Sequence, residues 1–219
     1  MCFSATASFI ASGGLLLLSA ATYSVAQKKD KILIAIPMLF GIQQAFEGVQ
    51  WLYLDRGSTS SIAGYGFLFF AFIIWPVYVP AFVALLDTKR EKASRWFLAV
   101  GCLVSAYFVV VLATQPLRIR ERSSCVNYTF HLPGQWFVAA LYLVAILGPF
   151  LFSSRPVFRW FGGIIFLLAA IAGYVYHHNF ISVWCFFAAI VSGMFFLFVQ
   201  RKRSKRQRRV QHNITATQQ

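Results

Sequence analysis

The stretch ILIAIPMLFGIQQAFEGVQWLYL, from Ile32 to Leu54, decides the fold class of this chain. It is long enough to cross a bilayer, because a hydrocarbon core of roughly 30 Å needs about 20 mainly apolar residues in a helix. Glu47 lies within it and is the one acidic residue in any apolar run of this length. A carboxyl in a membrane is costly unless it faces other protein groups or water. The stretch therefore predicts a helical membrane bundle with a polar interior.

Six further apolar runs approach or reach the same length. The composition agrees with a membrane protein, since 12% of the residues are charged, against roughly 25% in an average soluble domain. The runs are continuously apolar rather than alternating, which favours helices over barrel strands. We predict an all-α, polytopic bundle of seven transmembrane helices in residues 1–200. The runs are Phe9–Ala26, Ile32–Leu54, Ile62–Leu86, Trp96–Thr114, Trp136–Phe152, Trp160–Tyr176 and Phe180–Gln200.

The basic residues predict how this bundle is oriented. The 20 Lys and Arg residues divide 16 against 4 between alternate sides of a seven-helix bundle. Because positive residues favour the cytoplasmic side, we expect a multi-pass protein with the N-terminus outside and the C-terminus inside. No Lys or Arg precedes the first run, whereas Lys28, Lys29 and Lys31 follow it. This order is typical of an uncleaved anchor rather than a signal peptide.

Residues 201–219 form a basic tail that we expect to be disordered in the cytoplasm. It reads as a stop-transfer signal, and its charges also favour contact with anionic phospholipid headgroups at the lipid bilayer surface. Nucleic acid is not expected as a partner, because no aromatic residue interleaves the charges. The residues expected at the headgroups are Arg201, Lys202, Arg203, Lys205, Arg206, Arg208 and Arg209.

The second run carries the strongest candidate site. Gln43, Glu47, Gln50 and Trp51 have helical spacing, so they share one face, which must look into the bundle. A desolvated carboxyl favours its protonated form, so we expect Glu47 to carry a proton at neutral pH. An adjoining strip of residues lets another helix come close. Its members are Gly41, Gln44 and Gly48.

In the predicted topology, this site lies in the outer half of the membrane. The sixth run ends on the same side with His177, and the seventh begins there with Ser182, Trp184 and Cys185. With Glu47 these groups would line an outward-opening vestibule, together with Tyr174, Tyr176, His178, Cys2, Ser4 and Thr6. The candidate ligand or proton site is therefore Glu47, Gln43, Gln50, Trp51, His177 and Trp184.

Two interpretations of Glu47 stay open. The first is a site that binds or translocates a small solute or a proton, because ionisable groups inside membranes are usually functional. The second is a structural polar peg in a non-enzymatic scaffold or sensor that binds a partner protein or lipid. Neither interpretation requires catalysis, so the sequence favours a protein that is not an enzyme.

The four cysteines do not form a metal motif, since no CxxC or HExxH occurs. We expect no metal and no cofactor. Cys102 and Cys185 lie inside apolar runs, where a thiol behaves as a small hydrophobe. Cys2 and Cys125 both fall on the outer side, so they can form a disulfide if that compartment is oxidising.

Several short motifs carry a resemblance. They are MCFSATASF at 1–9, QQAFEGVQW at 43–51, GFLFF at 66–70, WP at 75–76 and SVWCFF at 182–187. With these motifs, the chain resembles a family of uncharacterised, mainly bacterial, multi-pass membrane proteins that open with the same MCFSATASF peptide. The resemblance runs over about residues 1–200. It implies a bacterial inner membrane and no particular activity.

A zinc-dependent intramembrane lipid hydrolase is a further alternative. Alkaline ceramidases have seven helices and hold zinc with three His and an Asp. In this chain the seventh run has no His, and Asp87 is at the end of a run. His177 and His178 are adjacent, so on a helix they point about 100° apart and are poorly placed to share one ion. The residues disfavour this alternative.

Overall fold

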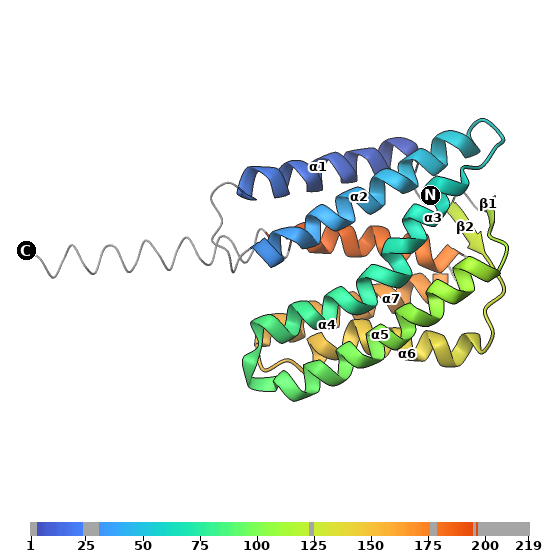
Figure 1. Ribbon diagram of the computed structural model, residues 1–219. Coiled ribbons are helices and arrows are strands. Elements are labelled where there is room, and N and C mark those ends of the chain that lie inside the picture. Colours follow the sequence, from blue (N-terminus) through green and yellow to red (C-terminus); the bar gives the residue numbers. More distant parts are fainter. Residues whose placement is uncertain (1–3, 24–30, 123–124, 176–178, 195, 197–219) are drawn as a thin grey trace, which may run out of the picture.

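The computed structural model describes residues 4–23, 31–122, 125–175, 179–194 and 196. Within these ranges the protein is mostly helical, with seven continuous helical segments (Figure 1). Each of the seven predicted runs corresponds to one of them. The segments are α1 (Ala5–Tyr23), α2 (Lys31–Leu54), α3 (Ser61–Leu68) continuing through the π-helix η2 (Phe69–Ile74) into α4 (Trp75–Leu86), the 3-10 turn η3 (Thr88–Arg90) leading into α5 (Glu91–Thr114), α6 (Gln135–Leu151), α7 (Pro156–Val175) and the last helix (Phe180–Met194).

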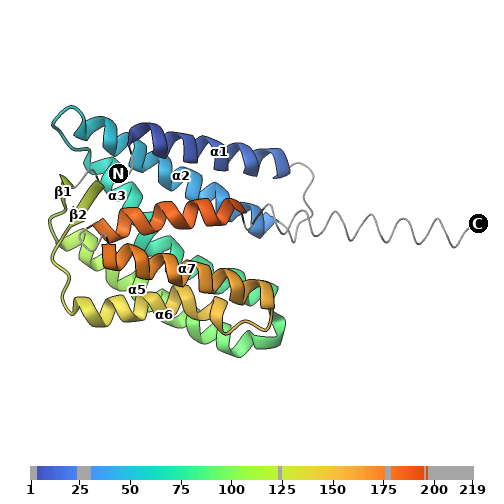
Figure 2. The ribbon, with the colours of Figure 1, turned by 180° about the vertical axis from the view of Figure 1, so that it is seen from behind.

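The helices lie side by side and reverse direction from one to the next (Figures 1 and 2). The turn between α2 and α3 lies at one end of the bundle, together with the segment between α5 and α6. The connections from α4 to α5 and from α6 to α7 lie at the opposite end. This second end carries η3 and the start of α7, so it is the strongly basic end. The described basic residues there are Lys31, Lys89, Arg90, Lys92, Arg95, Arg155 and Arg159.

The bundle buries polar side chains and exposes apolar ones, the reverse of a water-soluble globule. Gln43, Gln44 and Gln50 are completely buried. Large side chains such as Ile62 and Leu103 are more than two thirds exposed, at 81% and 71%. Lipid, rather than water, is the solvent that suits such a surface.

Three helical segments are long and apolar enough to cross a membrane, as judged from the described residues: Ser61–Leu86, Thr88–Thr114 and Pro156–Val175. Three shorter apolar helices are Ala5–Ala21, Gln135–Leu151 and Phe180–Met194. These helices support a membrane protein.

The mostly helical fold agrees with the all-α prediction, but the segment between α5 and α6 contains a small β-structure that the prediction did not include. This structure is an antiparallel hairpin of β1 (Arg118–Arg122) and β2 (Cys125–Thr129), paired from Arg118 with Thr129 to Arg122 with Cys125. Four consecutive residues of β2, from Cys125 to Tyr128, are buried. The hairpin forms because β2 packs on the end of the bundle and pairs with β1.

The path through η2 explains how a proline-rich helix is accommodated. Pro76 and Pro80 have no backbone N–H, so carbonyls one turn earlier lose their usual partners. Two neighbouring helices donate to carbonyls of η2 instead. Ser105 Oγ of α5 donates to Ile73 O at 2.9 Å, and Tyr142 Oη of α6 donates to Ala71 O at 2.7 Å. The irregular helix is therefore held by side chains of α5 and α6.

Glycines on α2 allow α1 to pack closely, as the Gly41, Gln44 and Gly48 strip predicts. A Cβ atom on Gly41 would lie 2.9 Å from Leu16 Cγ, and one on Gly48 would lie 2.9 Å from Phe9 Cε1. Both contacts are closer than side chains tolerate. The strip therefore faces α1, and the face of Glu47 turns toward the rest of the bundle.

Candidate functional site

The predicted polar face of α2 lies inside the bundle. Gln43 and Gln50 are 0% exposed, Glu47 is 1% exposed and Trp51 is 4% exposed. The four side chains line up because positions three and four apart on a helix are neighbours. The prediction that this face turns inward is confirmed.

The Glu47 carboxyl accepts hydrogen bonds at both oxygens. Ser182 Oγ of the last helix donates to Oε1, and Gln44 Nε2, one turn earlier on α2, donates to Oε2 at 3.4 Å. Both donors are neutral. Among the described residues, no Lys or Arg forms an ion pair with this carboxyl. An ionised Glu47 would thus have hydrogen bonds but no counter-charge from the part of the chain that the structure describes.

Gln43 links α2 to the start of α4. Its Oε1 accepts a hydrogen bond of 2.7 Å from Trp75 Nε1, at the point where η2 ends. Cys185 of the last helix lies close to both Gln43 and Glu47. Three helices therefore meet at the polar face of α2.

Several polar atoms beside Glu47 have no partner within the described residues. They are Gln43 Nε2, Gln44 Oε1, both side-chain polar atoms of Gln50, the indole nitrogen of Trp51 and the hydroxyl oxygen of Tyr128. Gln50 and Trp51 follow Glu47 by three and four positions, and Tyr128 lies close enough to interact electrostatically with its carboxyl. A buried polar atom without a partner costs about 1–3 kcal/mol. These atoms offer both donors and an acceptor to a small polar guest.

The hairpin covers this end of the bundle. The Tyr128 ring stacks on Phe67 of α3, with ring centres 5.0 Å apart. Asn179 Nδ2 donates to Arg122 O at 2.8 Å, which ties the hairpin to the start of the last helix. Burial raises the pKa of Tyr128 well above its usual value, and the nearby Glu47 and Cys185 raise it further. The phenol therefore stays a hydrogen-bond donor.

With this cover, the described residues do not form the expected outward-opening vestibule around Glu47. The carboxyl is enclosed between α2, the last helix and β2, and its 1% exposure leaves almost no contact with the surroundings. The sequence reasoning missed the hairpin and so expected an opening there. A guest would reach Glu47 only after a rearrangement of the covering residues.

The remaining predicted residues fall in different places. Trp184 is 5% exposed and packs against Tyr142, with ring centres 5.8 Å apart. Cys125 is completely buried and disulfide-bonded. Its predicted partner Cys2 lies outside the described residues, as does His177, so both remain predictions. The same holds for the lipid-headgroup residues of the tail, 201–209.

Two neighbours of Glu47 were not among the predicted site residues. Ser182 was expected among the polar groups on the same side as Glu47, but its direct hydrogen bond to the carboxyl was not predicted. Tyr128 lies in the hairpin, which was expected to be a loop. The available signal was the spacing of Val126 and Tyr128, two positions apart as on one face of a strand. Two residues are too few to predict a strand.

A second buried acid lies at the basic end. Asp87, at the end of α4, is 1% exposed and accepts hydrogen bonds from Ser153 Oγ at 2.6 Å, from Ser154 N at 2.5 Å and from the Ser154 hydroxyl. Burial alone would raise the pKa of Asp87, but these hydrogen bonds and the charge of Arg155 hold it below the usual value. This cluster joins the connection after α4 to the connection after α6.

A metal centre has no support in the described part of the chain. No three His, Cys, Asp or Glu side chains come together there. His177 and His178 of the hydrolase alternative lie outside the described residues, so the structure adds nothing about them.

Comparison with known proteins gives one match. The model of a family described as of unknown function matches residues 1–211. No curated protein and no solved structure matches the chain. No activity or ligand therefore comes from a relative.

Proposed function

The chain belongs to the family of unknown function DUF6629, and we propose that it is a seven-span inner-membrane protein that binds or translocates a proton or a small polar solute at Glu47. The supporting observation is a completely buried carboxyl with neutral hydrogen-bond partners beside unpartnered polar atoms. In this proposal the N-terminus is outside and the C-terminus inside.

Seven spans fit the arrangement of the helices. Three segments are long enough by themselves, and α1, α2, α6 and the last helix lie beside them in the same bundle (Figures 1 and 2). Their alternating direction puts the connections rich in Lys and Arg at one end, as the positive-inside rule requires. The hairpin then lies on the outer side.

A proton is the guest that the site suits best. Deprotonation of Glu47 would leave a negative charge with no described counter-charge, and burying such a charge is costly. The neutral form fits its neighbours, since Ser182 and Gln44 are also neutral. Loss or gain of the proton would change the strength of the hydrogen bond between Glu47 of α2 and Ser182 of the last helix. The unpartnered polar atoms of Gln50, Trp51 and Tyr128 provide hydrogen bonds for water or a small polar solute beside the carboxyl.

Proteoliposomes containing the full chain and an internal pH-sensitive dye test this proposal. An imposed pH gradient should decay faster with the wild-type protein than in empty vesicles, and Glu47→Gln should abolish that difference. Asp87→Asn is the matched control, because it neutralises the other buried acid at the opposite end. A Glu47→Gln variant that conducts like the wild type would refute the proton site.

The alternative function is a scaffold or sensor in which Glu47 only fixes the helices. One observation favours it: both carboxyl oxygens already accept hydrogen bonds, one of them from another helix. Glutamine is nearly isosteric with glutamate, so Glu47→Gln would then preserve folding and capture of the partner. Infrared spectra recorded across a pH range would separate the two functions, since a titrating Glu47 gives a carboxyl band that the variant lacks.

A further inference from the structure

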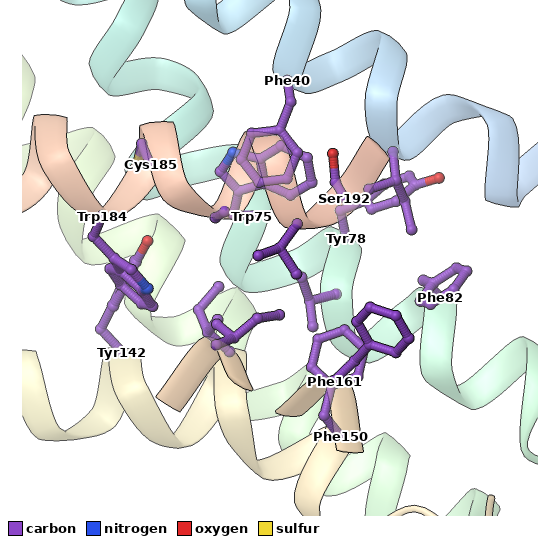
Figure 3. Close-up of a pocket in the computed structure, with 16 residues that line it drawn as sticks. Phe40, Trp75, Tyr78, Phe82, Tyr142, Phe150, Phe161, Trp184, Cys185 and Ser192 are labelled. Carbon is purple, nitrogen blue, oxygen red and sulfur yellow. The ribbon is translucent and has the colours of Figure 1, made fainter. Parts of the chain in front are cut away.

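We propose that the apolar cavity in the other half of the bundle binds an acyl chain of an anionic phospholipid, with Arg155 contacting the headgroup. The cavity has a volume of about 80 Å³ and is partly open to the outside of the protein. Figure 3 shows its lining, with Phe40 of α2 across the space from Phe150 of α6 and Phe161 of α7. At one side the cavity adjoins the proton site, because Trp75 and Cys185 line it and Trp75 also bonds to Gln43. Its test leaves Glu47 unchanged.

The walls of this cavity suit hydrocarbon. Almost all of its surface is apolar, and most of the polar groups in its lining bond to other protein atoms. Tyr78 Oη donates to Ile32 O at 2.6 Å, and Ser192 Oγ donates to Ala189 O at 2.7 Å. These groups have little left to offer a polar ligand. An apolar cavity of about 150 Å³ in another protein admits benzene, so this cavity of about 80 Å³ limits the occupant to a short segment of the acyl chain.

A cation lies close to one side of the cavity. Phe82 and Phe150 both line the cavity, and both pack against Phe158, with ring centres 5.7 and 6.2 Å away. The Arg155 guanidinium lies 5.8 Å from the centre of the Phe158 ring on the exposed surface. One aromatic ring therefore separates the lining from an exposed Arg. An anionic amphiphile fits this pair of features, because guanidinium binds phosphate well and the cavity takes the chain.

The position along the bundle agrees with a membrane lipid. Arg155 lies in the connection between α6 and α7, at the basic end (Figure 1). Anionic headgroups gather at the cytoplasmic surface, which the proposed topology assigns to this end. A chain inserted from that surface would pass Phe82 and Phe150 and point toward Trp184, which lies on the far side of the cavity from Phe82 (Figure 3).

Bromine-labelled lipids offer a direct test, because bromine quenches tryptophan fluorescence at short range and Trp75 and Trp184 line the cavity. The exposed tryptophans are first replaced by phenylalanine at Trp96, Trp136 and Trp160. The full chain is then placed in phosphatidylcholine vesicles that contain phosphatidylglycerol brominated in its acyl chains. We expect clear quenching, and much weaker quenching when phosphatidylcholine carries the bromine instead.

Variants separate the cavity from general lipid contact. Ala188→Leu fills the cavity and should remove most of the quenching. Ile190→Phe adds bulk to the same helix at a half-exposed position outside the cavity, so it should keep the quenching. Ile146→Ala enlarges the cavity and should increase quenching, which keeps the test informative if Ala188→Leu does not fold.

The headgroup contact has its own pair of variants. Arg155→Gln should reduce quenching by brominated phosphatidylglycerol to the phosphatidylcholine level. Arg95→Gln, which removes another exposed arginine at the same end, should not. Equal quenching by both brominated lipids, or quenching that Ala188→Leu leaves unchanged, would overturn the proposal.

Discussion

Ser182 of the last helix donates a hydrogen bond to the Glu47 carboxyl of α2, although 135 residues separate them in the chain. The bond joins two helices at the centre of the polar face. Both interpretations of Glu47 depend on this bond, because a structural peg and a proton site both need Ser182 in place. The strength of the bond is therefore worth measuring.

A double-mutant cycle of Glu47→Leu and Ser182→Ala should give a coupling free energy of about 0.5–2 kcal/mol, because hydrogen bonds between membrane helices average about 0.6 kcal/mol with a maximum near 1.7. The measurement is the free energy of unfolding in detergent, followed by circular dichroism. Ser182→Thr retains the hydroxyl and serves as the control. Strictly additive single effects would show that the two side chains do not interact.

The Asp87 cluster predicts a loss of stability in acid. The pKa of Asp87 lies below its usual value of 3.8 despite burial, because Ser153, Ser154 and Arg155 favour the carboxylate. A depressed pKa stabilises the fold above the usual value, and this stabilisation is lost as the pH falls through the lower pKa of the folded state. Thermal unfolding from pH 6 down to pH 2 should show a steeper decline for the wild type than for Asp87→Asn. Parallel curves would contradict this assignment.

The sequence was sufficient for the helices and for the orientation of α2. Ile32–Leu54 and Ile62–Leu86 match α2 and the α3 to α4 segment within one residue at each end, because the length of an apolar run directly reflects the bilayer core. The inward face of Glu47 followed from the cost of exposing a carboxyl to lipid. Both arguments are local and need no knowledge of neighbours.

The sequence was not sufficient for contacts between distant segments. Ser182 is one of several serines in apolar runs, and only the packing selects it as the partner of Glu47. The hairpin was missed because strand formation depends on the surface available to it, here the end of the bundle beside Phe67. Trp184 lies in the predicted bundle interior but lines the apolar cavity, since its direction depends on the rotation of the last helix.

A glycine contact between α4 and α5 gives a prediction about packing. A Cβ on Gly101 would lie 1.8 Å from the Pro76 carbonyl oxygen, which is backbone and cannot move aside alone. Gly101→Ala should therefore destabilise the protein by about 1–3 kcal/mol, the usual cost of overpacking. Gly13→Ala is the matched control, since a Cβ there meets nothing within 4 Å and alanine should stabilise α1 by about 0.5–1 kcal/mol. Equal effects at both positions would contradict the close approach.

The predicted disulfide between Cys2 and Cys125 tests both the pairing and the orientation. Cys125 is disulfide-bonded, whereas Cys102 and Cys185 are free in the described structure. If the hairpin and the N-terminus share an oxidising outer compartment, alkylation of the denatured protein without reductant should modify Cys102 and Cys185 but spare Cys2 and Cys125. Mass spectrometry of peptides measures this.

Cys125→Ser should lower the free energy of unfolding by about 2–4 kcal/mol, and reductant should lower that of the wild type similarly. Cys102→Ser is the control, because its free thiol contributes no cross-link. Alkylation of Cys2 and Cys125 without reductant, in protein isolated under oxidising conditions, would contradict the pairing. In that case the placement of the N-terminus on the outer side would lose its chemical support and would rest on the charge distribution alone.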